Sequence, residues 1–403
     1  MLISHRARMA ALALVTLGSL VLAACGQSSS GSSQAGGGAS APSGPSTVKV
    51  GVMLPLTGNT AWAGKTNKVA AEMAAEEINA SGAAGKYKIE LAFADSQCEP
   101  GPAHDAAQKL ITQDKAQLLI GEWCSSASVA AAQVARDNKI PLLVEISTAD
   151  GIAKNGGPYT FQSIMQNRDI DQHEAKLLTE KFNFATVGML VENNDFGLTF
   201  RKNMTEFLTK AGKKITIDVK QDRSDTNFYP VMTRIQSEKP DILVISLSAG
   251  QSANFVKALA ESGITIPVVS DYPPPPYIFE KQVGQQAAKI GLVRGTFYLD
   301  NPNITPRQKE FIAKFEPRAS QAVGEQHYAT HWDIAAYDSV YLVADALKRG
   351  GPDPANFAKA MAASKLDGVL GHYEFDQNRE VKPDGLPFVF IKDVEGGKLE
   401  VVK

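Results

Sequence analysis

The stretch Val48-Lys-Val-Gly-Val-Met-Leu-Pro55 decides the fold class, because it is an almost continuous apolar run of strand length. An amphipathic stretch of helix length follows at Gly64–Ala80, and a second strand-like run at Lys88–Asp95. Apolar runs that alternate with helices are typical of parallel strands buried on both faces of a sheet. The chain is therefore predicted to begin an α/β fold with a strand, a helix and a second strand.

The alternation of strand and helix continues to residue 271 and passes through two cycles. Leu118–Trp123 and Pro141–Ser147 are the later strands predicted in the first cycle, and Thr186–Glu192 begins the second. Two such cycles predict two lobes, each built on a doubly wound parallel sheet. The length of 403 residues also favours two domains over a single core.

The carboxyl-terminal part of the chain changes pattern, with a helix predicted at Arg307–Phe315 and strand-like segments returning near the end. Late segments that complete both lobes require the chain to cross between them more than once, through a multi-strand hinge. We expect residues 47–166 with about 297–368 in the first lobe, and about 167–296 with 369–403 in the second.

The composition excludes several classes of protein. Hydrophobic residues make up 44% and charged residues 21%, which is ordinary for a globular protein and unlike a disordered or polytopic membrane chain. The net charge of −2 provides no basic excess for a nucleic-acid backbone. The stretch Asn59–Thr66 resembles a P-loop, but Asn59 replaces its first glycine and Trp62 crowds the loop. We therefore expect no nucleic-acid partner and no cofactor.

The amino-terminal segment has the pattern of an export signal. A short basic stretch precedes an apolar run from Met9 to Ala24, which is too short for a comfortable transmembrane helix. The run stops at Cys25, as in the bacterial lipobox whose cysteine is lipidated. Residues 1–24 are thus a predicted lipoprotein signal peptide, and residues 25–46 a lipidated cysteine with a flexible linker. An unlipidated signal peptide is the alternative.

Two further cysteines, Cys98 and Cys124, follow the carboxyl ends of neighbouring predicted strands. They could lie side by side, and in an oxidising compartment a disulfide is the usual state. Two free thiols are the alternative. His327 and His331 have the spacing of metal ligands on one helix face, but no third ligand is suitably placed. Two surface histidines are the favoured interpretation, and we expect no metal.

In doubly wound sheets ligands bind beyond the carboxyl ends of the strands, so these ends predict the site. Ser125 and Ser126 open a helix, where a hydroxyl and free amides suit a carboxylate, and helix capping is a compatible role. Thr148 is predicted to contact the ligand, with a turn cap as the alternative. The first lobe therefore contributes these candidates: Trp62, Trp123, Ser125, Ser126, Ile146, Ser147 and Thr148.

The second lobe contributes Phe196, Ser248, Asp271 and Tyr272. Asp271 would meet a cationic ligand group or cap the segment that follows it. Four consecutive prolines at 273–276 after Tyr272 predict a stiff extended lip. Aromatic residues from both lobes would give the crevice flat apolar walls.

Several motifs carry a resemblance to a known family over about residues 47–395. Their order and spacing resemble the branched-chain amino acid binding proteins, the type I periplasmic solute-binding family of ABC importers. The motifs are Gly51-Val-Met-Leu-Pro-Leu-Thr-Gly58, Ala75-Glu-Glu-Ile-Asn79, Asp95-Ser-Gln-Cys98, Ile120-Gly-Glu-Trp-Cys-Ser-Ser126, Asn194-Asp-Phe-Gly197 and Gly371-His-Tyr-Glu-Phe-Asp376.

The resemblance implies a type I periplasmic binding protein fold and supports a Cys98–Cys124 disulfide. It also implies that Ser125 binds the ligand carboxylate, and that Ile146 and Thr148 occupy the two positions that bind the α-amino and α-carboxyl groups.

This sequence departs from the family in the second half of the site. Family tyrosines fall on Ala63, Phe196 and Ser248, and the acidic ammonium ligand aligns only with Asp271 or Tyr272. The part of the site that binds the ligand carboxylate therefore matches the family, whereas the part that binds the ligand side chain differs from it. We expect an amino acid or a related, aromatic carboxylate as the ligand.

The function that follows is a lipid-anchored solute receptor, held at the cell membrane and facing the periplasm or exterior. It would close two lobes over a small ligand and deliver it to an ABC permease, as a monomer and without catalysis. A sensory binding protein that serves a receptor kinase or chemoreceptor is the alternative. An exported hydrolase is a third possibility, but we find no nucleophile or metal constellation for it.

Overall fold

The computed structural model describes residues 45–271, 283, 292–295, 304–385, 389–394 and 398–401. The predicted signal peptide, Cys25 and nearly all of the linker lie outside the described residues, as do Tyr272 and the four prolines. Within the described part of the chain, no helix combines the length and the apolar character that a bilayer span requires.

The first lobe is built on a five-stranded sheet in which every neighbouring pair is parallel. Its strand order is β2-β1-β3-β4-β5, so the chain runs outward in both directions from β1. The strands are β1 (Ser46–Leu54), β2 (Tyr87–Asp95), β3 (Leu118–Ile120), β4 (Leu142–Val144) and β5 (Thr160–Gln162).

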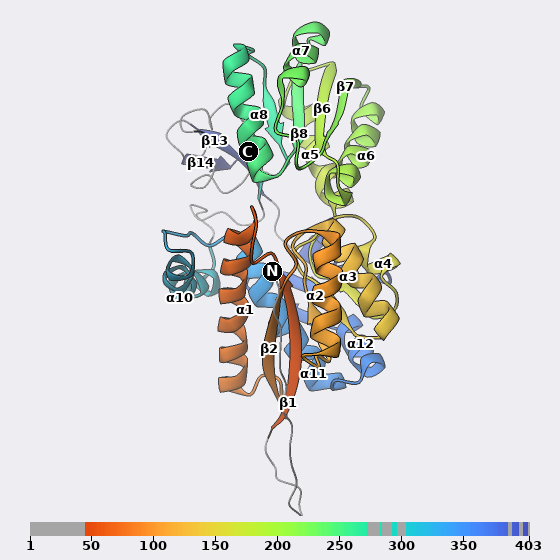
Figure 1. The fold of residues 1–403 in the computed structure, drawn as a ribbon, viewed down its shortest axis with the longest axis vertical. Helices are drawn as coiled ribbons and strands as arrows, with labels where there is room; N and C mark the ends of the chain where they lie inside the picture. Colours follow the sequence, from red (N-terminus) through yellow and green to blue (C-terminus); the bar gives the residue numbers. More distant parts are fainter. Residues whose placement is uncertain are drawn as a thin grey trace, which may run out of the picture. The chain divides into compact units, whose positions relative to one another are not determined.

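The connections of this sheet are helical, as the alternating pattern predicts. They are α1 (Ala61–Ser81), α2 (Pro100–Thr112), α3 (Ser125–Asn138) and the single turn α4 (Ile152–Asn155). Figure 1 shows α1 and α2 on either side of β1 and β2. This arrangement buries both faces of the sheet, which is why its central strands are continuously apolar.

The second lobe has a seven-stranded sheet of order β14-β13-β10-β9-β8-β6-β7. Its strands are β6 (Thr186–Glu192), β7 (Lys214–Gln221), β8 (Ile242–Ser246), β9 (Val268–Ser270), β10 (Leu292–Gly295), β13 (Val389–Val394) and β14 (Lys398–Val401). The helices of this lobe with described bounds are α5 (Asn167–Lys181), α6 (Asp195–Lys210), α7 (Tyr229–Glu238) and α8 (Ala249–Ser262).

The parallel sheet predicted for this lobe is confirmed, with an antiparallel edge that the sequence did not predict. β6 to β10 are parallel, but β13 pairs antiparallel with both β10 and β14. Val394 of β13 is paired with Lys398 of β14, so these two strands form a hairpin. A hairpin needs only a short turn, whereas another parallel strand would need a crossover helix.

The segments after β10 return to the first lobe. They are α10 (Pro306–Val323), α11 (His331–Gly350), α12 (Pro354–Ala362), the hairpin strands β11 (Lys365–Asp367) and β12 (His372–Glu374), and the short 3-10 helix η2 (Pro383–Gly385). Both α10 and α11 pack against α1, and α12 packs against α11.

The boundary predicted at residue 369 is placed too early. Val369, Tyr373, Phe375 and Val381 are all buried in the core cluster that contains β1 and α11 of the first lobe. Their apolar side chains fill that core, so the chain rejoins the second sheet only with β13. A strand-like pattern of apolar residues does not reveal which of two cores the residues enter.

Helix α10 also differs from its prediction, since it continues past Phe315 to Val323 with Pro317 inside it. A proline removes one backbone hydrogen bond from a helix interior and is usually a helix end. Here Phe311, Phe315 and Ala319 form one buried stripe that extends beyond the proline. Burial of this stripe explains why the helix persists.

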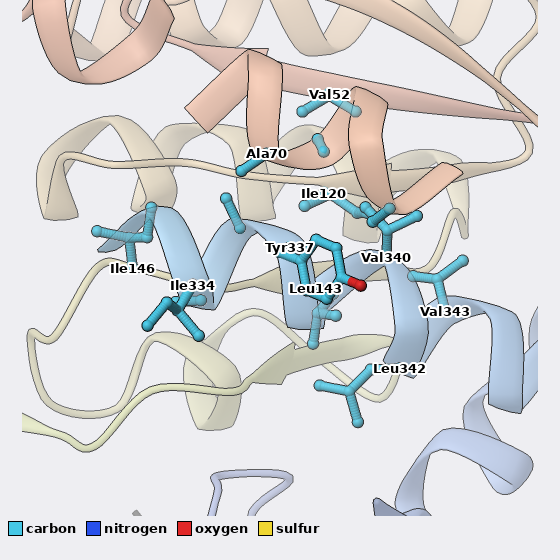
Figure 2. Close-up of a cluster of buried hydrophobic side chains, with 14 of the residues drawn as sticks. Val52, Ala70, Ile120, Leu143, Ile146, Ile334, Tyr337, Val340, Leu342 and Val343 are labelled. Carbon is cyan, nitrogen blue, oxygen red and sulfur yellow. The ribbon is translucent and has the colours of Figure 1, made fainter. Parts of the chain in front are cut away.

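The core of the first lobe is closed by α11. Figure 2 shows Ile334 and Tyr337 of this helix gathered with Val52, Ile120 and Leu143 of three neighbouring strands. Full burial of a side chain of this size contributes roughly 1.5–3 kcal/mol. The helix from the carboxyl-terminal part of the chain is therefore integral to a lobe that begins near residue 46.

Two glycines hold equivalent places in the two lobes. A Cβ atom at Gly64 in α1 would lie 2.1 Å from the carbonyl oxygen of Pro55, and one at Gly197 in α6 would lie 2.1 Å from that of Glu192. Only glycine allows the helix to begin so close to the end of the preceding strand. The P-loop-like glycine of the sequence therefore serves helix packing.

Candidate ligand-binding site

A cavity of about 470 Å³ is lined by residues from both lobes. Its walls are the segments that follow β1, β2, β3 and β4 in the first lobe and β6, β7 and β8 in the second, where doubly wound sheets bind ligands. Seven residues of the predicted site line it: Trp123, Ser125, Ser126, Ile146, Thr148, Phe196 and Ser248.

The amino-terminal end of α3 faces this cavity. Cys124 occupies the N-cap position without a side-chain cap bond, so neither Ser125 nor Ser126 caps the helix. The Ser125 hydroxyl accepts a hydrogen bond of 3.3 Å from the amide of Ala149. The Ser126 hydroxyl accepts one of 2.9 Å from the amide of Asp195 in the second lobe.

The predicted disulfide between Cys98 and Cys124 is confirmed, with the two Cα atoms 5.3 Å apart. Both residues line the cavity. The bond joins the loop after β2 to the residue that precedes Ser125, and so holds the start of α3 in place.

The aromatic wall differs from the prediction. Trp123 lines the cavity together with Trp332 of α11, and their ring centroids are 5.0 Å apart. Trp62 packs behind this pair, 5.9 Å from Trp123 and 6.3 Å from Trp332, and is not a lining residue. Sequence reasoning missed Trp332, because it lies in a helix far from any strand end.

Ser147 is also not on the cavity. Its side chain is buried, donates a hydrogen bond of 2.7 Å to the carbonyl of Glu122, and lies 2.6 Å from the hydroxyl of Ser128. The residues on either side of it, Ile146 and Thr148, do line the cavity. In an extended segment successive side chains point to opposite sides, which explains the difference.

Asp271 is fully buried and lies away from the cavity, contrary to its predicted contact with a cationic ligand group. Its amide donates to the carbonyl of Ile245 at 2.9 Å, so the residue still follows the sheet ladder rather than leaving it. Its carboxylate accepts from Ser246 at 3.0 Å and lies with those of Asp171 and Glu174, within 4.8 Å of one another. Tyr272 lies outside the described residues.

The two histidines, His327 and His331, lie in different surroundings. His327 is buried, with Nε2 3.1 Å from the carboxylate of Asp333, whereas the ring of His331 lies against Trp332. The prediction of two surface histidines is therefore wrong for His327. Among the described residues, the cluster with the spacing of metal ligands is Asp171, Glu174 and Asp271, and neither histidine belongs to it.

Charged residues that the sequence reasoning missed line the cavity on the side of the second lobe. Arg223 follows β7, and its Nε donates to Glu192 at 2.6 Å. Its terminal nitrogen donates to the carbonyl of Cys98 and to Glu99, each at 3.1 Å. Both Glu192 and Arg223 lie at strand ends, so the strand-end rule itself could have found them.

Two buried carboxyls lie behind the first-lobe wall. Glu122 accepts hydrogen bonds of 2.7 Å from Ser96 and from the amide of Cys124. Burial raises the pKa of the Glu122 carboxyl to about 7. Burial, together with the neighbouring charge of Glu122, raises the pKa of Glu145 to about 8.

Two lobes on parallel sheets, with one cavity lined by the strand ends of both, define a two-lobed binding protein of the α/β class. The family model described as periplasmic binding protein matches residues 47–394. The chain therefore belongs to the periplasmic binding protein family, in the type I branch of the branched-chain amino acid group. This family is extracytoplasmic, and the chain is a binding protein rather than an enzyme.

Several known proteins are similar to this chain. An amino acid binding protein of Pseudomonas aeruginosa is 26% identical over 341 residues, covering 83% of this chain and 87% of the relative. A branched-chain amino acid transporter substrate binding protein of Streptococcus pneumoniae, solved with isoleucine, has a TM-score of 0.75 at 24% identity, covering 89% of this chain and 99% of that one. A solute binding protein of R. palustris, solved with 4-hydroxybenzoate, has a TM-score of 0.76 at 23% identity, covering 89% and 95%. The two structures confirm the predicted fold.

Proposed function

We propose that the protein is an extracytoplasmic solute-binding lipoprotein of an ABC importer, and that it closes its lobes over a small carboxylate-bearing ligand. The observation that carries the proposal is the cavity lined by both lobes with the start of α3 in its wall. The similar solved proteins were crystallised with isoleucine and with 4-hydroxybenzoate, and both of these ligands carry a carboxylate.

The carboxylate is assigned to the amino-terminal end of α3. The first amides of a helix have no partner inside it and favour an anion. The hydroxyl of Ser125 accepts from Ala149, and a hydroxyl that accepts still has its own proton to donate. Thr148 lies on the same wall and supplies a second hydroxyl.

The rest of the ligand is assigned to the aromatic wall. Trp123, Trp332 and Phe196 all line the cavity. Ring faces suit a branched aliphatic or an aromatic group, since they offer large apolar area without needing a polar partner. A ligand held between these walls touches both lobes and so stabilises the closed form, which a permease can then recognise.

Isothermal titration calorimetry with leucine, isoleucine, valine, benzoate and 4-hydroxybenzoate tests the ligand class. We expect at least one of these to bind, and Ser125→Ala combined with Thr148→Ala to weaken it at least about tenfold. Ser81→Ala with Thr112→Ala is the matched control, because those hydroxyls bond only to carbonyls of their own helices. A panel without any binding member contradicts the ligand class, and unchanged affinity in the first variant contradicts the site.

The lipid anchor has its own test. We expect the full chain, expressed in a bacterium, to fractionate with membranes and to carry lipid on Cys25. Cys25→Ser should move it to the soluble fraction while the calorimetric affinity stays the same. A wild-type chain recovered without lipid would contradict the anchor alone. We also expect a monomer in size-exclusion chromatography, because a permease must reach both lobes.

A further inference from the structure

Arg223 connects the two lobes at the edge of the cavity. Within its own lobe its Nε donates to Glu192 at 2.6 Å. Toward the first lobe its terminal nitrogen donates to the carbonyl of Cys98 and to the carboxylate of Glu99, each at 3.1 Å. One guanidinium therefore joins groups that belong to different lobes.

The second-lobe end of this connection is firmly held. The buried carboxylate of Glu192 also accepts from Asn194 at 2.8 Å and from the amide of Ser248 at 3.0 Å. Burial opposes the charge on Arg223, but the carboxylates of Glu192 and Glu99 outweigh it and raise its pKa. The guanidinium is thus charged and aimed across the cavity edge.

The first-lobe end is held by a covalent bond. Cys98, whose carbonyl accepts from Arg223, is joined through the disulfide to Cys124. Cys124 is the N-cap residue of α3, directly before Ser125. A change in the position of Cys98 caused by Arg223 would therefore also move the start of α3, to which the ligand carboxylate is assigned.

We propose that Arg223 is a closure latch: its pair with Glu192 persists when the lobes separate, whereas its bonds to Cys98 and Glu99 form only when they close. This role rests on the closing mechanism of the proposed function. Arg223 is a positioning residue that sets the population of the closed form, and through it the rate at which a bound ligand escapes.

The test uses the ligand-free protein and reads closure at one amide. Asp195 is the first residue of α6, so its amide has no acceptor within that helix, and it donates instead to Ser126 of the first lobe. Opening of the lobes removes this acceptor. Hydrogen exchange at the Asp195 amide, resolved by fragmentation mass spectrometry, therefore measures the open population.

We expect Arg223→Ala to raise the exchange rate of the Asp195 amide about tenfold, because two hydrogen bonds from a charged donor are lost. Glu99→Gln should raise it less, about threefold, since Glu99 is exposed and the carbonyl contact remains. Arg234→Ala is the matched control, because that arginine pairs with Glu238 of its own helix. It should leave Asp195 unchanged.

Unchanged exchange at Asp195 in both Arg223→Ala and Glu99→Gln overturns the latch, as does a wild-type amide that exchanges as fast as an unprotected peptide. Faster exchange in β6 and β8 as well as at Asp195 would show that Arg223 only stabilises the second lobe, and this result would also overturn the latch. If Arg223→Ala does not fold, Glu99→Gln decides, because it leaves the Glu192 pair in place. No ligand is used, so failure of the ligand panel and failure of the latch are separate results.

Discussion

The indole rings of Trp123 and Trp332 lie 5.0 Å apart in the wall of the cavity, although one follows β3 and the other belongs to α11. Their contact brings the carboxyl-terminal part of the chain into a site otherwise built from strand ends. Trp62 packs behind both, so all 3 tryptophans of the chain form one cluster.

Ligand binding should therefore change the intrinsic tryptophan fluorescence of the protein. We expect Trp62→Phe to keep this change, because Trp62 does not line the cavity. Trp123→Phe with Trp332→Phe should abolish most of it. A titration with the calorimetric ligand, followed by emission spectra, checks both variants. A response that depended on Trp62 alone would contradict the assigned wall.

The disulfide should contribute substantially to stability. Cys98 and Cys124 are 26 residues apart, and closing a loop of this length stabilises a protein by about 3 kcal/mol in the chain-entropy model. We expect Cys98→Ser with Cys124→Ser to lower the free energy of unfolding by about this amount in urea titrations. The reductant dithiothreitol should destabilise the wild type and leave the double variant unchanged. Equal urea midpoints for the double variant and for the wild type without reductant would refute the prediction.

The buried carboxyls should make stability depend on pH. Burial raises the pKa of Glu145 from 4.5 to about 8. Between these two pH values the folded protein therefore holds a proton on Glu145 that the unfolded chain has released. The stabilisation is complete below pH 4.5 and is lost as the pH rises toward about 8. The slope for one such group reaches about 1.4 kcal/mol per pH unit.

Glu145→Gln should flatten this decline, because the amide has no proton to release. Urea unfolding at intervals from pH 5 to pH 8 measures the slope. Some decline should remain in the variant, since the pKa of Glu122 is also raised, to about 7. Glu72→Gln on the surface of α1 is the control and should keep the wild-type slope. Parallel curves for the wild type and Glu145→Gln would contradict the assignment.

Gly197 should not tolerate a side chain. A Cβ there would lie 2.1 Å from the carbonyl oxygen of Glu192, so Gly197→Ala must move α6 away from β6. We expect a loss of about 1–3 kcal/mol in thermal or urea unfolding. Gly250→Ala in α8 is the control, because no atom lies within 4 Å of its added Cβ. Equal stability of the two variants would show that α6 can shift without cost.

Regular elements were largely predictable because their signal is local. The apolar run Thr186–Glu192 is a strand with those same bounds, and the helix predicted at Gly64–Ala80 is α1, Ala61–Ser81. The short strands β5, β10 and β11 were missed because none contains more than two consecutive apolar residues, whereas the equally short β3 and β4 are entirely apolar. β10 pairs with β13, about 100 residues later in the chain, whereas β11 pairs with the nearby β12 in a hairpin.

The site was predictable where it follows strand ends. Ser125, Ser126 and Thr148 line the cavity because parallel strands bring their carboxyl ends to one edge. Asp271 follows a strand too, yet one further ladder hydrogen bond to Ile245 keeps it in the buried sheet. Such a bond depends on the partner strand and leaves no mark in the local pattern.

The sequence by itself determined the class of fold and the strand ends that line the cavity, since each follows from local periodicity. It brought Cys98 and Cys124 to neighbouring strand ends, and the structure decided between a disulfide and two free thiols. Only the tertiary structure decided that Trp332 completes the wall, that Val369–Val381 remains in the first lobe and that Arg223 reaches Cys98. These facts depend on contacts between residues far apart in the chain. Such contacts are selected by how side chains fill a shared core and satisfy buried charges, and the local pattern does not encode either.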